Sequence, residues 1–216
     1  MAIPDQADDT AGKPTAGIEE YDIALIESLL DRYGVIAAPL IDKEQVAGGF
    51  SGLYPVLKRM EEHGNLVRGM FVKGFGAAQF AGRDTVDALR GDEARSQSCV
   101  ALDVTDPANL TGSAITWPEQ HHMKPARRAE SVIVLDHGMP VLFAVPKSHR
   151  IVSFTDDERI LQPACTELAY ALQHQSKGSV SFAEMNGESL KERNEYRRLL
   201  HAAGFVDSPQ GMKLYG

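Results

Sequence analysis

The sequence of 216 residues contains only two cysteines, Cys99 and Cys165, which are far apart and form no CxxC pair. This spacing favours two buried, reduced thiols over a disulfide or a zinc site. No apolar run approaches the roughly 18 residues that cross a membrane, and residues 1–17 lack the apolar segment of a signal peptide. We therefore expect a cytoplasmic protein without a membrane partner, and a disordered acidic tail over residues 1–17.

An ATP-hydrolysing motor is also absent from the sequence. A phosphate-binding loop needs G-x-x-x-x-G-K-[ST], but the Gly12-Lys13 pair is followed by Pro14. Residues 92–95 (Asp-Glu-Ala-Arg) resemble a helicase acidic box, yet they follow a polar stretch instead of a buried apolar strand. We interpret them as a solvated linker and expect no ATP or magnesium to be bound by this chain.

Metal and nucleophile motifs are missing as well. Adjacent histidines on a strand point to opposite faces, and no third ligand stands near His121 and His122. A polar loop is the favoured interpretation, so no metal site is predicted. No G-x-S-x-G elbow is present and neither cysteine stands in a nucleophile motif, which leaves no support for a hydrolase triad.

The charge is negative overall but unevenly distributed. The chain carries a net charge of −8, and residues 1–20 hold five acidic side chains against a single lysine. Residues 58–83 instead have five basic against two acidic side chains, and residues 119–150 have five basic against three acidic ones. Local patches can bind phosphates while long-range attraction stays weak, so composition permits a nucleic-acid role without requiring it.

The pattern up to residue 92 predicts a winged helix. Apolar residues recur at helical spacing over 21–33 and again over 50–60, with a short helix beginning at Pro39 between them. Two short strands, 66–72 and 77–81, are joined by a glycine-rich turn. Three helices followed by a hairpin is the element order of a winged-helix domain, which we assign to residues 18–92.

Beyond a polar linker at 91–98 the pattern becomes extended. Strands are expected over 99–104, 131–135, 140–145 and 151–154, with a hairpin signal at Asp136-His137-Gly138-Met139. A helix is expected from Pro163 in its first turn, a strand over 180–185, a helix over 190–203 and a final turn at 208–211. The fold class is therefore α+β, with an α+β domain over residues 99–216.

Two segments have both a structural and a functional interpretation. The wing, residues 73–80, either packs its phenylalanines in the core or presents Lys73 and an exposed Phe75 to a nucleic-acid backbone or base pair. The polar run from Asp103 to Asn109 follows a strand, where turn capping is the favoured interpretation. A site that faces a sugar-phosphate backbone or a base is the alternative.

A set of short pieces in this order resembles the C-terminal region of the large Lhr-type (large helicase-related) helicases. The resemblance spans about residues 18–216, and its pieces are specific together although each is short. They are Arg32-Tyr33-Gly34-Val35, Gly48-Gly49-Phe50, Leu53-Tyr54-Pro55-Val56-Leu57, Met60-Glu61-Glu62-His63-Gly64, Arg68-Gly69-Met70-Phe71-Val72, Gly76-Ala77-Ala78-Gln79-Phe80-Ala81, Val86-Asp87-Ala88-Leu89-Arg90, Thr105-Asp106-Pro107-Ala108-Asn109, Gly112-Ser113-Ala114, Trp117-Pro118, Pro125-Ala126-Arg127-Arg128, Ala202-Ala203-Gly204-Phe205 and Pro209-Gln210-Gly211-Met212-Lys213-Leu214.

The resemblance implies membership of a family of ATP-dependent, DNA-repair-associated helicases whose ATPase, with its ATP and magnesium, lies in upstream domains. The C-terminal region of that family is similar to winged-helix DNA glycosylases with a β-barrel-like domain, so a curved, mainly antiparallel barrel-like sheet is implied here. In some members this region is linked to uracil removal. The glycosylase motif Gln-x-[Gln/Glu] belongs to an upstream winged helix, so no catalytic residue is carried over. After Asn109 this chain has Leu110-Thr111-Gly112 where the family has Pro-Tyr-Gly.

We accordingly expect a nucleoid-associated accessory module that engages single-stranded or forked DNA alongside the upstream helicase domains. The candidate nucleic-acid-binding residues are Lys58, Arg59, Arg68, Lys73, Phe75, Arg127 and Arg128. One alternative is a glycosylase-like enzyme in which Asp103 or Asp106 polarises water. Another is an oligomerisation or docking domain, and thus a homo-oligomer; a stand-alone transcription regulator is less favoured because the second domain has no ligand-pocket signal.

Overall fold

The computed structural model describes residues 15–76, 78–91, 99–175, 178–192 and 194–216. The chain divides into two compact units, residues 1–93 and 94–216, each described below by itself. Residues 1–14 of the predicted tail, together with the Gly12-Lys13 pair, lie outside the described residues, as does the acidic box at 92–95. None of the described helices is both long enough and apolar enough to cross a membrane.

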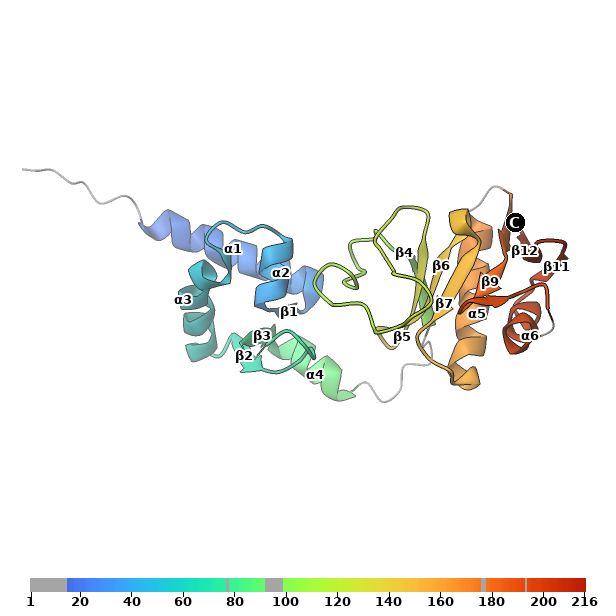
Figure 1. The fold of residues 1–216 in the computed structure, drawn as a ribbon. Coiled ribbons are helices and arrows are strands. Elements are labelled where there is room, and N and C mark those ends of the chain that lie inside the picture. The colour runs from blue at the N-terminus through green and yellow to red at the C-terminus, as the bar shows by residue number, and fades with distance from the viewer. Residues whose placement is uncertain (1–14, 77, 92–98, 176–177, 193) are drawn as a thin grey trace, which may run out of the picture. The chain divides into compact units, whose positions relative to one another are not determined.

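The first unit has the element order predicted for a winged helix (Figure 1). Its core is formed by apolar residues of α1 and α3, among them Ile26, Leu29, Leu53 and Leu57, packed against Phe80 of the hairpin. Strand β1 pairs with β3, and β3 pairs with β2, all antiparallel. The elements are α1 (Thr15–Tyr33), β1 (Val35–Ile36), α2 (Ala38–Lys43), α3 (Gly49–Glu62), β2 (Leu66–Gly69), β3 (Gln79–Gly82) and α4 (Arg83–Gly91).

The second unit is built on a six-stranded sheet in the order β10-β9-β7-β6-β5-β4, in which the β7–β9 pair alone is parallel. A separate three-stranded sheet has the order β11-β12-β8. The elements are β4 (Cys99–Asp103), β5 (Val132–Asp136), β6 (Met139–Val145), a short 3-10 turn η2 (Pro146–Ser148), β7 (Arg150–Ser153), α5 (Glu158–Gln175), β8 (Ser179–Phe182), β9 (Glu184–Met185), β10 (Glu188–Ser189), α6 (Glu195–Ala202), β11 (Val206–Ser208) and β12 (Gly211–Tyr215).

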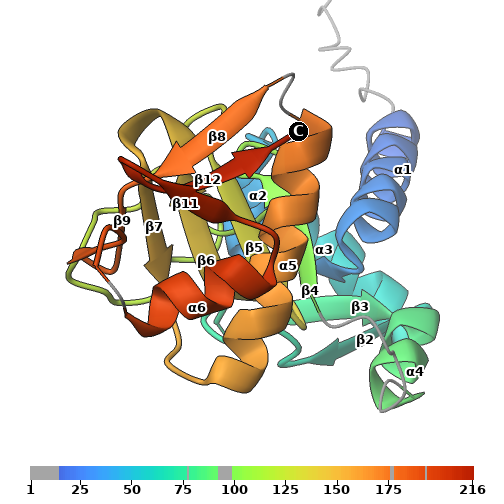
Figure 2. The same ribbon diagram turned by 90° about the vertical axis from the view of Figure 1, so that its right-hand side faces the viewer.

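Both faces of the six-stranded sheet are covered. Alternate residues of a strand point to opposite faces, so Val132 and Val134 of β5 face α5, which lies along the sheet with α6 beside it (Figure 2). Ile133 of β5 and Phe143 of β6 point the other way and pack with Trp117. That residue belongs to the long loop of residues 104–131, green to yellow in Figure 1, which thereby closes the second face.

The expectation of a barrel-like sheet is wrong, because the sheet is open. Within the described residues its edge strands are β4 and β10, which do not pair with each other. A helix on one face and a loop on the other bury the apolar side chains, so closure of the sheet is not needed to form the core. The mixed helix-and-sheet class and the mainly antiparallel pairing are as predicted.

Three boundaries in the second unit differ from the prediction. Helix α5 begins five residues before Pro163, at Glu158, because Asp157 caps it by accepting a hydrogen bond from the Arg159 amide at 3.0 Å. The expected strand 180–185 is divided between two sheets, with β8 ending at Phe182 and β9 beginning at Glu184. Helix α6 begins at Glu195, later than expected, because Asn194 accepts from the Arg197 amide at 2.9 Å.

Candidate nucleic-acid interface

Two predicted cations lie on the exposed side of α3, and each already has a carboxylate partner. The Lys58 ammonium is 3.6 Å from the Glu62 carboxylate one helical turn away. The Arg59 guanidinium is 2.5 Å from the Glu19 carboxylate of α1. A phosphate would have to compete with these carboxylates, so α3 presents little net positive charge to a ligand.

The hairpin carries the other two predicted site cations of the first unit, Arg68 and Lys73. The Arg68 guanidinium lies 6.0 Å from the centroid of the Phe80 ring and donates a hydrogen bond of 3.4 Å to the Tyr54 hydroxyl. Lys73 is exposed and has no ion pair with any residue that the structure describes. Lys73 is therefore the cation of the wing that is most available to a phosphate.

The prediction of an exposed Phe75 is wrong, because only 5% of its surface is accessible. The residues of the wing fold back around Gln79, which is completely buried. Its side-chain carbonyl accepts from the Phe71 and Val72 amides, at 2.9 and 2.8 Å, and its amide donates to the Val72 and Gly76 carbonyls, at 2.9 and 2.7 Å. A large apolar side chain that is exposed instead is that of Met70, which directly follows β2 and is 80% accessible; the sequence interpretation missed it.

The polar run after β4 folds the beginning of the 104–131 loop. Asp103 accepts from the amide and the hydroxyl of Thr105, at 2.8 and 2.5 Å, and Asp106 accepts from the Ala108 amide at 2.8 Å. Asn109 is completely buried, donates to the Val104 carbonyl and accepts from the Thr111 amide. These are the turn-capping roles that the sequence favoured for this run.

Arg127 and Arg128 have different environments. One amino group of Arg127 donates to the Asn109 and Thr111 carbonyls, at 2.7 and 3.1 Å, and the other donates to the Asp106 carbonyl at 3.3 Å. Arg127 therefore holds the two ends of the loop together. Arg128 is exposed, and its side chain makes no hydrogen bond or ion pair to the described part of the chain.

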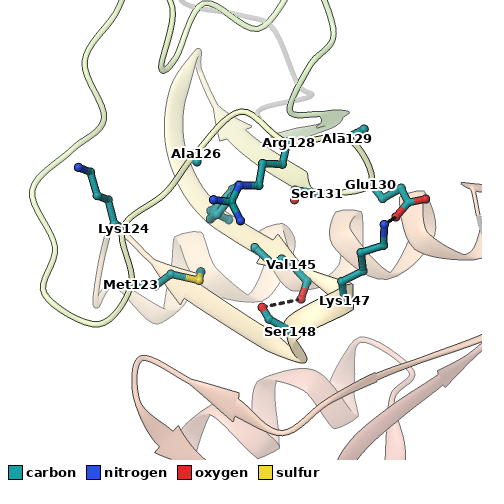
Figure 3. Close-up of a pocket in the computed structure, with 11 residues that line it drawn as sticks. Met123, Lys124, Ala126, Arg128, Ala129, Glu130, Ser131, Val145, Lys147 and Ser148 are labelled. Atoms are coloured by element: carbon teal, nitrogen blue, oxygen red, sulfur yellow. Dashed lines mark hydrogen bonds and ion pairs between the residues drawn. The ribbon is translucent and has the colours of Figure 1, made fainter.

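A pocket of about 300 Å³ lies beside Arg128, between the end of the loop and the end of β6. Figure 3 shows Arg128 between Lys124 on one side and the ion pair of Lys147 with Glu130, 2.6 Å long, on the other. Lys124 has no ion pair with a described residue, so the pocket has three cations at its rim and one carboxylate. The rest of the lining consists of two serines, Ser131 and Ser148, and of the apolar residues Met123, Ala126, Ala129, Phe143 and Val145.

The backbone at the rim of this pocket is strained. Glu130 has φ of +66°, a left-handed conformation that is uncommon outside glycine. Its amide donates to the second carboxylate oxygen of Asp103 at 3.2 Å, which helps to hold that conformation. Burial acts to raise the pKa of Asp103, but hydrogen bonds from Thr105 and Glu130 and the charge of Arg127 outweigh it and lower the pKa below its ordinary value.

The structure thus brings together only part of the predicted set of site residues. Arg128 lies at a pocket, Arg127 supports the loop that carries Arg128, and Asp103 supports the pocket rim. Lys124 and Lys147 were missed as site residues, although the excess of basic residues over 119–150 was a signal for them. His121 and His122 are exposed in the loop, and among the described residues no group of three His, Cys, Asp or Glu side chains is placed to hold a metal ion.

Comparison with known proteins agrees with the resemblance seen in the sequence. Residues 16–100 match a family model described as the winged-helix domain of the large helicase-related protein. A protein of Escherichia coli (strain K12) named "Lhr helicase/uracil glycosylase" is 34% identical over 200 residues, 89% of this chain. One of Mycolicibacterium smegmatis named "Lhr helicase/ probable uracil glycosylase" is 33% identical over 201 residues, 87% of this chain. The chain spans 13% of the length of each of these relatives.

Proposed function

The chain belongs to the family of large helicase-related proteins, in which it corresponds to a C-terminal module. We propose that this module holds single-stranded or forked DNA for the upstream helicase domains. The observation that carries the proposal is Arg128, an exposed guanidinium that no described residue neutralises, in a loop held by buried hydrogen bonds. An unpaired cation on a loop whose backbone is held in place suits a phosphate better than one on a mobile loop, because less ordering of the loop is needed on binding.

The phosphate contacts are divided unequally among the basic residues. Arg128 and Lys124 of the second unit and Lys73 of the wing make the main contacts in this proposal. Lys58, Arg59, Arg68 and Lys147 contribute less, since each already has a partner in its own unit. Contacts of this kind position a strand without reading its sequence. The ATP and magnesium that drive unwinding belong to the upstream domains in this proposal.

The test is fluorescence anisotropy of labelled single-stranded and forked DNA, measured with the purified chain over a series of salt concentrations. Arg128→Ala is expected to weaken binding about tenfold at low salt, the loss of one charge-assisted contact. The matched control is Arg198→Ala, which removes an exposed guanidinium of α6 that is paired with Glu158. Equal losses of DNA affinity in both variants would mean that only the net charge of the protein matters, which would contradict a site at Arg128.

A docking or oligomerisation domain is the outcome if no DNA binds at low salt. In that case light scattering should show a stable multimer of the chain. If the module holds DNA, we expect it to bind DNA whatever oligomeric state light scattering finds for the free chain.

The names of the two relatives favour a glycosylase-like activity as a second candidate. The two candidate carboxylates, Asp103 and Asp106, do not line the pocket, and both accept hydrogen bonds within turns. Release of uracil from uracil-containing DNA, abolished by Asp103→Asn or Asp106→Asn, would establish the enzyme. No release by the chain would exclude it as a glycosylase acting alone.

A further inference from the structure

The pocket beside Arg128 combines a basic rim with an apolar interior, and we propose that it receives the base of one unpaired nucleotide whose phosphate binds Arg128 and Lys124. This inference rests on the proposed function and names the part of the DNA that the site takes. A site for phosphate alone needs cations but no apolar cavity. The apolar lining therefore points to a ligand that is both charged and flat-faced, as a nucleotide is.

The size of the pocket limits the ligand. Its volume of about 300 Å³ stands at the lower end of the range of small-ligand sites, roughly 300–1,000 Å³. A single nucleotide fits this limit, whereas a stacked base pair does not. A base in a duplex is stacked and paired, and it reaches such a pocket only after it leaves the stack. The geometry thus selects single strands and the unpaired arm of a fork over intact duplex.

The floor of the pocket is rigid. Phe143 of β6 has only 2% of its surface exposed. Its ring centroid is 5.1 Å from that of Trp117, which in turn stacks on Phe154 at 6.2 Å. These three rings hold the loop against the sheet, so the floor is formed before any ligand arrives. Phe143 itself is almost fully buried, so the accessible apolar wall above it is formed by Met123, Ala126, Ala129 and Val145. Such a preformed apolar wall binds the face of a base without regard to its identity, because every base has an apolar face.

Polar groups line one side of the pocket. Figure 3 places the Ser131 hydroxyl between Arg128 and Glu130, and the Lys147–Glu130 ion pair closes that side. A hydroxyl donates and accepts, and a lysine–glutamate pair offers one donor and one acceptor. Each of the four bases can use such a mixed edge, so only a slight base preference is expected.

The experiment compares two labelled strands of equal length, an oligothymidylate and a strand of abasic nucleotides, which carry the same phosphates. The oligothymidylate is expected to bind about tenfold more tightly, the contribution of one stacked base. Equal affinities would overturn the inference while leaving the proposed function intact. Failure of both strands to bind would overturn the proposed function itself.

A variant that fills the pocket locates the base. Ala126→Leu adds apolar volume inside the pocket and removes no charge, so it should lower the affinity for oligothymidylate to that for the abasic strand. Ala129→Leu fills the same pocket from another position and serves if the first variant does not fold, as judged by thermal melting. Ala202→Leu, at an exposed position of α6, is the matched control. A filled pocket that still distinguishes the two strands would overturn this location for the base.

Discussion

Gln79 has no exposed surface, yet it is an uncharged polar residue in the middle of an apolar core. Its side-chain amide uses four hydrogen bonds to close the wing on itself. Both ends of the amide are needed, since its oxygen serves two backbone amides and its nitrogen serves two carbonyls. The wing is therefore shaped by one side chain more than by its glycines.

Replacing Gln79 by leucine should lower the free energy of unfolding by about 3 kcal/mol, because two backbone amides and two carbonyls lose their partners in a buried place. In this variant we also expect the backbone amides of Phe71 and Val72 to lose their protection from hydrogen exchange. Ala24→Leu, at an exposed position of α1, is a suitable control. Unchanged protection at both amides would show that the wing keeps its shape without Gln79.

Cys165 is buried in the second core, and burial raises the pKa of its thiol to about 12. At pH 8 only about one thiol in ten thousand is then ionised, and the thiolate is the reactive form. We expect iodoacetamide to leave Cys165 unmodified in the native protein and to modify it in urea, as mass spectrometry of peptides would show. Cys99, which is partly exposed, should react first. Rapid native labelling of Cys165 would mean that this core opens readily.

For single residues, the sequence predicted the roles that depend on neighbours along the chain. The caps at Asp103, Asp106 and Asn109 follow from the turn-forming habits of these side chains. The burial of Phe75 could not be predicted, because it depends on Gln79 drawing the wing inward. In the same way, two adjacent arginines look equivalent in a sequence, and only the carbonyls around Arg127 distinguish it from Arg128.

At the scale of elements, the 104–131 loop behaves as a layer of the fold. Trp117 packs on the sheet, and Arg127 satisfies carbonyls of the successive turns at residues 106–111, at the other end of the loop. The loop thus has its own core contacts and its own hydrogen-bonded frame. The side chains that stabilise the loop differ from those proposed to bind DNA, so mutation can separate the two roles.

Arg127→Ala should lower the free energy of unfolding of the second unit by about 2 kcal/mol, since hydrogen bonds from a charged donor are lost and carbonyls lose their partner. Arg128→Ala should leave stability unchanged and reduce DNA affinity. The single tryptophan, Trp117, lies in this loop and reports its unfolding in urea through fluorescence. If both variants unfold at the wild-type urea concentration, the framing role of Arg127 is refuted.

The loop should also respond to acid. The pKa of Asp103 is lowered below its ordinary value of 3.8, so its ionised form favours the folded state. That stability is fully present above pH 3.8 and is lost as the pH falls through the lowered pKa. Acid unfolding followed by Trp117 fluorescence should therefore be less steep below about pH 4 in Asp103→Asn than in the wild type. Identical acid profiles would assign the sensitivity to other carboxylates.

Elements with local signals were predicted well. The hairpin between β5 and β6 follows from His137 and Gly138, whose φ values of +46° and +78° suit a two-residue turn. The division of residues 180–185 between two sheets was not predictable, because it depends on partners such as Met212 of β12 and Arg150 of β7. The open sheet was not predictable either, because it depends on helix α5 packing on one face of the sheet.

At the scale of the whole molecule, the charge of −8 opposes the approach of DNA, while the sites themselves are basic. Attraction then acts only at short range, within about 10 Å at ordinary salt. Association should be slower than for basic DNA-binding domains, and affinity should come from slow dissociation once the cations are in contact.

The salt dependence of binding measures how many cations take part. Three phosphate contacts on a single strand predict a slope of about −2 for log K against log salt concentration. Arg128→Ala should flatten that slope by about 0.7, whereas Arg198→Ala should leave it unchanged. A slope near zero in the wild type would mean that phosphates contribute little to whatever binding is seen.

The loop that covers one face of the sheet has a consequence for how this protein can change over evolution. Surface loops usually accept insertions and substitutions freely. Here the segment around Trp117 and Asn109 forms core, so a scan of all single substitutions should find it as intolerant as a central strand. Positions 124 and 128, which are exposed, should be constrained by ligand binding alone and not by stability. Two neighbouring codons, those of Arg127 and Arg128, would then record two different selective pressures.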